Sequence, residues 1–333
     1  MSKHIAVIGA GGWGTALANL LGKKGYDVRL WAYLPEERDE LQRFGENKRF
    51  LPDIKLSENL EFSCDMEWCI KNAECIVSAV PSGAVEATAY NIAKYIDVNT
   101  QPVVTVSKGL HKDTKERLST VIERCIPEVK VAALSGPSHA EEVAREMITT
   151  NVAASSDEKI AEYVCNLFTT DYFRVYTNSD ITGVEMGGAL KNIIALCAGI
   201  LDGMGMGDNA KAALMTRGMA EISRLGVKLG ANRETFFGLS GMGDLIVTCT
   251  SMHSRNRRAG ILIGQGKTAQ EAIDEVKMVV EGVPAAIAAY KLAKNCGVEM
   301  PITSAVYSVI CEGKDARECV TSLMTRPKKS EVE

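Results

Sequence analysis

The sequence predicts an α/β domain built on a parallel sheet, followed by a domain made only of helices. The first half alternates short apolar segments with amphipathic stretches of helical length, which is the pattern of strand–helix–strand units. After about Asp180 the strand-like segments stop, while helix-length segments continue to the C-terminus. We therefore expect two domains, at residues 1–184 and 185–333, with the crevice between them as the default place for a site.

The expected strands are short apolar segments bounded by turn residues. They are residues 5–9, 28–31, 75–80, 103–105 and 131–134, with two more at 152–154 and near 173–176. Helices are expected between them, for example at 15–24 and 36–43. In the second half, helices are expected at 187–201 and 209–229, and a glycine-rich break follows at 238–243.

Composition excludes several classes of protein. The 333 residues are 46% hydrophobic with a net charge of −4, so a large core is possible and nucleic-acid binding is not favoured. Basic residues cluster only at 255–258 and 326–329.

The 10 cysteines form no CxxC pair and no Cys/His cluster, which predicts reduced thiols and no metal site. No signal peptide precedes the first strand and no apolar run approaches a span of about 20 residues, so we expect a cytoplasmic protein.

The segment Gly9-Ala10-Gly11-Gly12-Trp13-Gly14 follows the first expected strand and opens a helix. Its GxGxxG spacing suits a dinucleotide: Gly9 allows a tight turn, Gly11 lets the backbone approach a pyrophosphate, and Gly14 lets the helix pack on the strand. This context predicts a Rossmann-type domain, although a plain tight turn is the alternative. The second strand ends in Trp31-Ala32-Tyr33-Leu34-Pro35 without the usual acid, so the choice between NAD and NADP stays open.

Polar residues in the second half suggest a reacting site. Lys191 follows Gly187-Gly188-Ala189 among apolar residues, and a partly desolvated lysine can exchange a proton near neutral pH. A surface lysine is the alternative. Asp244 follows a glycine-rich break and is either a site carboxylate or a helix cap. The segment Ser254-Arg255-Asn256-Arg257-Arg258 offers donors for a phosphate, or is a solvated basic turn.

Two turns in the first half face the ligand edge of the predicted sheet. Ser107-Lys108-Gly109 and Gly136-Pro137-Ser138 each follow an expected strand, and ligands bind at the carboxyl ends of parallel strands. Together with the segments above and with Thr248-Cys249-Thr250 and Val279-Val280-Glu281-Gly282, these motifs resemble the bacterial NAD(P)-dependent glycerol-3-phosphate dehydrogenase family. The resemblance extends from residue 4 to about residue 320.

The resemblance implies roles for individual residues. Lys191 would exchange a proton with the substrate oxygen at C2. The substrate would be held by Lys108, Gly136, Ser138, Asn192, Asp244, Thr248, Ser254, Arg255 and Asn256. NAD or NADP would be contacted by Gly9, Gly11, Gly12, Trp13, Gly14, Tyr33, Lys108, Ala140, Arg255, Val279 and Glu281, with no metal.

The implied activity is reduction of dihydroxyacetone phosphate to sn-glycerol 3-phosphate for glycerophospholipid synthesis, in a possible homodimer. Two alternatives remain at this point. One is another two-domain dehydrogenase acting on a hydroxy acid or an acyl-CoA, which would not explain the basic cluster. The other is a dinucleotide-sensing protein without catalysis, which would not need Lys191, Asp244 and Arg255 together.

Overall fold

The computed structural model describes residues 4–328 and 330–331, and the chain forms two compact units. The sheet unit comprises Met1–Gly188 and Ala231–Asp244, and the helical unit comprises Ala189–Gly230 and Leu245–Glu333. The chain first passes from the sheet unit to the helical unit between Gly188 and Ala189, and the sequence analysis expected a boundary between residues 184 and 185. The return of Ala231–Asp244 to the sheet unit is a feature that the sequence interpretation did not include.

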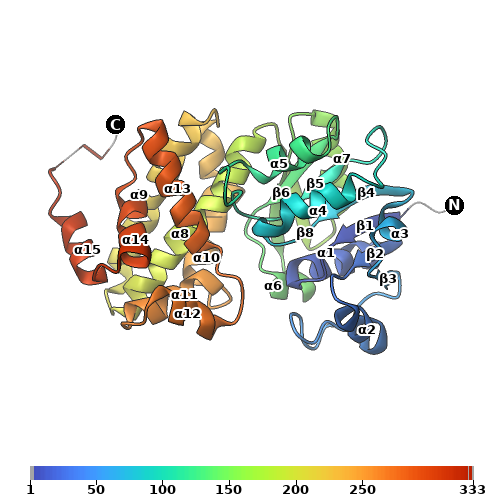
Figure 1. The fold of residues 1–333 in the computed structure, drawn as a ribbon, viewed down its shortest axis with the longest axis horizontal. Helices are drawn as coiled ribbons and strands as arrows, with labels where there is room; N and C mark the ends of the chain where they lie inside the picture. Colours follow the sequence, from blue (N-terminus) through green and yellow to red (C-terminus); the bar gives the residue numbers. More distant parts are fainter. Residues whose placement is uncertain (1–3, 329, 332–333) are drawn as a thin grey trace. The chain divides into compact units, whose positions relative to one another are not determined.

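The sheet unit contains one eight-stranded sheet with the order β3-β2-β1-β4-β5-β6-β7-β8 (Figure 1). Six strands run parallel, from β3 across to β6, and β7 pairs antiparallel with β6. The strands are β1 (His4–Ile8), β2 (Val28–Trp31), β3 (Leu60–Ser63), β4 (Ala73–Ser78), β5 (Val103–Thr105), β6 (Val131–Ser135), β7 (Thr149–Ala154) and β8 (Phe173–Asn178).

Two details differ from the predicted sheet. The sheet is mostly parallel, as the sequence predicts, but β7 departs from this direction, since Leu134 of β6 faces Ala153 of β7 in antiparallel register. Strand β3, at the sheet edge, was missed because its sequence, LEFS, is only four residues long and has no continuous apolar run. Within the described residues no strand follows β8, as expected.

Both faces of the sheet are covered by helices, which explains why the central strands are apolar throughout. On one face, Ile5 and Val7 of β1 pack with helices α1 (Gly12–Lys23), α2 (Pro35–Phe44), α6 (Ala140–Ala144) and α7 (Glu158–Phe168). On the other face, Ala6 and Ile8 pack with α3 (Met66–Ile70), α4 (Val85–Ile92) and α5 (Leu118–Cys125). Short 3₁₀ turns lie at Ser82–Ala84 (η1) and Arg233–Phe237 (η2), and a π-helical turn lies at Leu239–Gly243 (η3).

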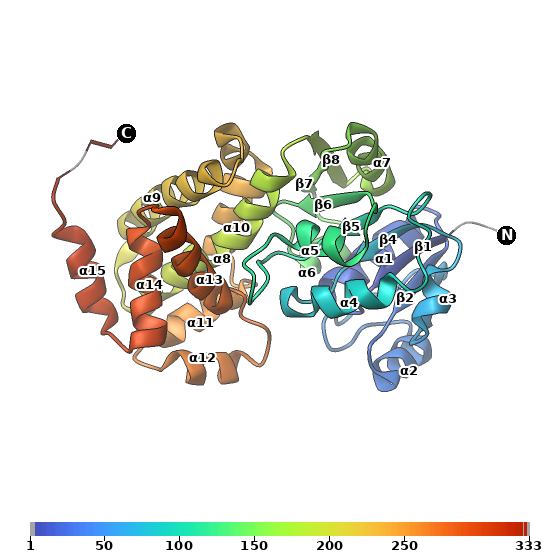
Figure 2. The same cartoon turned by 45° about the horizontal axis from the view of Figure 1, so that its top comes forward.

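The helical unit is built around two long helices, α8 and α9 (Figure 2). Helices α8 and α10 begin with residues of the sheet unit. The helices are α8 (Ile181–Gly203), α9 (Gly207–Lys228), α10 (Asp244–Thr250), α11 (Arg255–Gly264), α12 (Ala269–Val276), α13 (Gly282–Cys296), α14 (Pro301–Glu312) and α15 (Ala316–Met324).

Helices α8 and α11 cross with their backbones in direct contact. A Cβ atom added at Gly199 would lie 2.1 Å from the carbonyl oxygen of Arg257, and one at Gly260 would lie 2.1 Å from that of Leu196. Gly203 and Gly264 repeat this arrangement one turn further along. Glycines four residues apart on both helices therefore set the distance between them.

Helix α8 is long and apolar enough to cross a membrane by length and composition, which corrects the expectation that no segment reaches this limit. Its most apolar window is 100% buried inside the protein. Complete burial of this kind is the property of a core helix, and the helix accordingly packs against α11 through Gly199 and Gly203.

Candidate active site

The β1–α1 loop has the geometry of a phosphate cradle. Gly9 has a φ of 121°, and a Cβ there would lie 2.7 Å from the carbonyl oxygen of Ala79. A Cβ at Gly14 would lie 1.9 Å from the carbonyl oxygen of Gly9, so α1 presses directly on the loop. Gly11 has no atom within 4 Å of a Cβ position and is the N-cap of α1, with no side chain capping the helix. The N-cap of α1 therefore has open space beside it, where an anion can approach the first amides of the helix.

A buried asparagine holds this loop in place. The Nδ2 of Asn47 donates to the carbonyl oxygen of Ala10 (2.9 Å) and to the Oγ1 of Thr15 (2.8 Å). Thr15 Oγ1 donates to the same carbonyl (3.2 Å). Sequence reasoning missed Asn47 because it lies far along the chain, in an irregular segment. The structure also brings together two expected cofactor residues, since a Cβ at Gly12 would lie 3.7 Å from the Cβ of Ala140.

The end of β2 presents an aromatic ring to solvent. Tyr33 is 75% exposed and makes an edge-to-face contact with Trp31, with 5.9 Å between ring centroids. Glu36 and Glu37 lie in the first turn of α2, where carboxylates favour the positive end of the helix dipole. The two acids are thus explained by the helix, and neither occupies the end of the strand.

Four expected substrate residues meet at the carboxyl ends of β5 and β6. The Nζ of Lys108 donates to the carbonyl oxygen of Gly136 and to Oδ2 of Asp244, both at 2.8 Å. Ser138 Oγ donates to the same Gly136 carbonyl (3.0 Å). The side chain of Asp244 is 1% exposed and that of Lys108 is 19% exposed, so this is a largely buried ion pair. Asp244 also begins α10, which means that it belongs to a helix start and to the polar cluster at once.

Three buried polar atoms beside this cluster have no hydrogen-bond partner among the described residues. They are Oγ1 of Thr105, Oγ of Ser135 and Nδ2 of Asn151, which lie at the ends of β5 and β6 and on neighbouring β7. A Cβ at Gly136 would lie 2.5 Å from Asn151 Oδ1, and one at Gly188 would lie 2.8 Å from Ser135 Oγ. Buried polar groups are rarely left unpaired, so these atoms indicate that a polar ligand or water belongs at this edge. Isolated polar residues within apolar strands gave no signal in the sequence.

In the helical unit, Lys191 is almost completely buried. It is 5% exposed, and its Nζ donates to the Oγ1 of Thr248 at 2.8 Å. The alternative of a surface lysine is therefore wrong. An ammonium group at such a position is largely shielded from water, and the hydroxyl of Thr248 fixes its direction.

A line of hydrogen bonds runs beside Lys191. Asn256 Nδ2 donates to Oδ1 of Asn192 (2.9 Å), and Asn256 Oδ1 accepts from the backbone N–H of Gly282 (2.8 Å). A Cβ at Gly282 would lie 2.6 Å from the carbonyl oxygen of Asn192. These bonds hold the start of α13, with Glu281 and the half-exposed Val279 just before it, against α8 and α11.

The structure divides the basic cluster at 254–258 into residues with different partners. Ser254 caps α11 by accepting from the N–H of Arg257. The guanidinium of Arg257 binds Asp202 (2.7 Å) and the carbonyl oxygen of Thr250 (2.6 Å), so its role is structural. Arg255, in the first turn of α11, is exposed.

Among the described residues, no group of three or more His, Cys, Asp or Glu side chains is placed to hold a metal ion. The donors that the two units offer are instead amides, ammonium groups, hydroxyls and guanidinium groups. These groups suit an anionic organic ligand, and the β1–α1 loop fits the pyrophosphate of a dinucleotide.

Comparison with known proteins identifies the family. Two family models match, one described as the NAD-dependent glycerol-3-phosphate dehydrogenase N-terminus over residues 4–161 and the other as its C-terminus over residues 180–321. The chain belongs to the NAD-dependent glycerol-3-phosphate dehydrogenase family.

Curated relatives and a solved structure agree with this membership. The chain is 54% identical to the glycerol-3-phosphate dehydrogenase [NAD(P)+] of Moorella thermoacetica, over 100% of this chain and 99% of the relative. It is 51% identical to the Lactiplantibacillus plantarum protein of the same name, over 100% of both. The crystal structure of glycerol-3-phosphate dehydrogenase from Coxiella burnetii matches with a TM-score of 0.93 at 38% identity, covering 97% of this chain and 99% of that one.

Proposed function

We propose that this protein catalyses the reversible reduction of dihydroxyacetone phosphate to sn-glycerol 3-phosphate with NADH or NADPH, for glycerophospholipid synthesis. The observation that carries the proposal is the buried Lys191, oriented by Thr248, in a chain that matches dehydrogenases of this name over their full length. The alternatives of a hydroxy-acid or acyl-CoA dehydrogenase and of a sensing protein are not favoured by these relatives.

Lys191 is the proposed general acid and base. The bound dinucleotide supplies the hydride that reduces C2 of the substrate. The ammonium of Lys191 gives its proton to the oxygen at C2, and its positive charge stabilises the negative charge that develops there. In the reverse direction the neutral amine takes the hydroxyl proton. The hydrogen bond to Thr248 would keep the amine pointing at that oxygen.

The polar cluster of the sheet unit is proposed to bind the same substrate. Lys108, Gly136, Ser138 and Asp244 are already joined by hydrogen bonds and an ion pair. The carboxylate of Asp244 compensates the charge of Lys108 and fixes its Nζ, which reduces the entropy that would be lost when a ligand binds.

The remaining residues are proposed to hold phosphate and cofactor. Arg255, with Ser254 and Asn256, would bind the substrate phosphate, and Asn192 would support Asn256 through their hydrogen bond. Arg255 and Lys108 would also contact the dinucleotide. The other proposed cofactor contacts are Gly9, Gly11, Gly12, Trp13, Gly14, Tyr33, Ala140, Val279 and Glu281. We further propose a soluble, cytoplasmic homodimer with its domains divided near residues 184 and 185.

Replacement of Arg255 tests the phosphate assignment. Arg255→Ala should raise KM for dihydroxyacetone phosphate by at least about tenfold, because a charge-assisted hydrogen bond is lost. Unphosphorylated dihydroxyacetone should stay an equally poor substrate, since it lacks the group that Arg255 binds. Steady-state kinetics with both compounds measures this, with Arg174→Ala, an exposed arginine on β8, as the control. An unchanged KM for the phosphorylated substrate in Arg255→Ala would contradict the assignment.

A further inference from the structure

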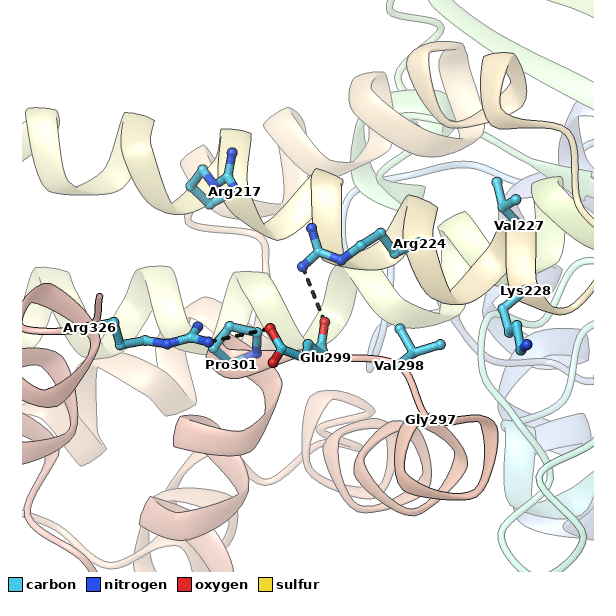
Figure 3. A pocket seen from close by; sticks show the side chains of 9 residues that line it. All are labelled: Arg217, Arg224, Val227, Lys228, Gly297, Val298, Glu299, Pro301 and Arg326. Carbon is cyan, nitrogen blue, oxygen red and sulfur yellow. Dashed lines mark hydrogen bonds and ion pairs between the residues drawn. The ribbon is translucent and has the colours of Figure 1, made fainter. Parts of the chain in front are cut away.

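The helical unit contains a basic pocket that the proposed reaction does not use. It is formed by α9, the segment between α13 and α14, and the chain that follows α15, and it has a volume of about 490 Å³ (Figure 3). Four of its lining side chains are cationic and one is a carboxylate. The lining residues are Arg217, Arg224, Val227, Lys228, Gly297, Val298, Glu299, Pro301 and Arg326.

The positive charges lie along one helix face. Arg217, Arg224 and Lys228 are spaced by seven and four residues on α9, which aligns their side chains on the same side of the helix. Lys228 is exposed and makes no hydrogen bond or ion pair with the described residues. Arg217 donates to the carbonyl oxygen of Glu331, and this partner, an uncharged carbonyl group, does not neutralise its charge.

Arg224 is only partly satisfied by the protein. Its Nη2 donates to the carbonyl oxygen of Glu299 (3.1 Å), while its buried Nε has no hydrogen-bond partner among the described residues. A guanidinium group presents a planar fork of donors that matches phosphate oxygens. Arg224 therefore keeps donor capacity that the described residues do not use, which adds to the attraction of the pocket for an anion.

The pocket has one lining carboxylate against four cationic side chains. Glu299 pairs with Arg326 at 3.6 Å, which is too long for a strong hydrogen bond, and its side chain is 67% exposed. The apolar side chains of Val227 and Val298 line the same pocket and lower its polarity. A bound anion would therefore be partly shielded from water, which strengthens its attraction to the arginines.

Buried hydrogen bonds hold one wall of the pocket in place. Glu221, which lies between Arg217 and Arg224 on α9, accepts hydrogen bonds from the backbone N–H groups of Ile302 (2.6 Å) and Thr303 (3.1 Å). These bonds fix the start of α14, and with it Pro301, against α9. A preformed site of this kind loses little entropy when it binds.

We propose that this pocket binds a small anion with two linked phosphate groups, of the pyrophosphate class, at a place separate from the reacting residues. One phosphate would bind Arg224 and Lys228, and the other would bind Arg326 in exchange for Glu299. The proposal does not depend on the identity of the reaction, because none of these residues takes part in it.

Isothermal titration with inorganic pyrophosphate tests the proposal, with NADH present in excess so that the loop at Gly9–Gly14 is already occupied. The full chain should bind it saturably, and the variant Arg224→Gln with Lys228→Gln should bind at least about tenfold more weakly, because two charged partners are lost. Glu299→Gln should bind more tightly than the wild type, since it removes the competing carboxylate. Lys291→Gln, an exposed residue on α13 outside the pocket, should bind like the wild type.

Two comparisons separate this pocket from the proposed active site and confirm the ligand class. Arg255→Gln should keep the pocket binding, and inorganic phosphate should bind more weakly than pyrophosphate. Wild-type affinity in the variant with Arg224→Gln and Lys228→Gln, loss of binding in Arg255→Gln alone, or equal binding of phosphate would overturn the proposal. Circular dichroism verifies that each variant is folded. Arg326→Gln, a single substitution at an exposed position, should also bind pyrophosphate more weakly than the wild type.

Discussion

The two lysines of the proposed site have different surroundings. Lys108 is partly exposed and pairs with a carboxylate, Asp244, so its charge is balanced on the protein itself. Lys191 is almost fully buried, and the hydroxyl of Thr248 is one of its partners, at 2.8 Å. The partial exposure of Lys108 suits a positive charge that binds and orients the substrate. The burial of Lys191 suits a group that transfers a proton to the substrate out of contact with water.

Replacing Lys191 separates these two roles. Lys191→Ala should lower kcat by about 100-fold or more, the usual contribution of a general acid, while the protein stays folded. Lys159→Ala, at an exposed position on α7, should keep wild-type kcat. Steady-state kinetics and circular dichroism measure both effects. If folded Lys191→Ala turns over like the wild type, another residue must supply the proton.

Helix packing determines where the residues of the helical unit lie. Gly199 and Gly260 allow α8 and α11 to touch through their backbones, which places Asn256 at a hydrogen-bond distance from Asn192. No side chain larger than hydrogen fits at these crossings. The positions of Lys191 and Arg255, which lie on these two helices, therefore depend on the glycines at the crossing.

Substitution of one of these glycines tests the packing. Gly199→Ala should lower the free energy of unfolding by about 1–3 kcal/mol, because its Cβ would meet a backbone oxygen that cannot move aside easily. Gly83→Ala is the matched control, since a Cβ there meets no atom within 4 Å. Urea unfolding of both variants measures the difference. Equal midpoints would show that the two helices can separate without cost.

Glu221 gives the connection between α9 and α14 a pH dependence. Burial raises the pKa of its carboxyl group from 4.5 to about 7. Because the folded protein holds this proton more tightly than the unfolded chain, Glu221 makes stability fall as pH rises from about 4.5 to about 7. Thermal unfolding across this range should show a smaller fall in Glu221→Gln than in the wild type. A fall of the same size in the variant would exclude Glu221 as its cause.

Much of the fold could be predicted because apolar runs and glycine positions are local signals. The loop from Gly9 to Gly14, and the turns with Lys108 and Gly136, lie after β1, β5 and β6 as predicted, because strand ends can be read from short apolar runs. The antiparallel direction of β7 could not be predicted, because a short apolar segment has the same residue pattern in a parallel and in an antiparallel strand. Likewise, nothing in the segment 254–258 distinguishes Arg257, which binds Asp202, from the exposed Arg255. Such differences arise from contacts between residues distant in sequence.

At the scale of the whole molecule, the match to relatives is complete in length. Both family models match, and the relatives are covered from end to end. The absence of an acid at the end of β2, where Tyr33 and Leu34 are exposed, leaves no carboxylate to repel a 2′-phosphate. We therefore expect both NADH and NADPH to serve as cofactors.

The oxidation of NADH and of NADPH after addition of dihydroxyacetone phosphate tests the central claim most directly. The absorbance of both cofactors should fall in proportion to enzyme concentration, with sn-glycerol 3-phosphate as the product. A sample with a 2-keto acid in place of the phosphorylated ketone should show no change. If dihydroxyacetone phosphate left the absorbance of both cofactors unchanged, or if the keto acid were reduced instead, the proposed function would be wrong.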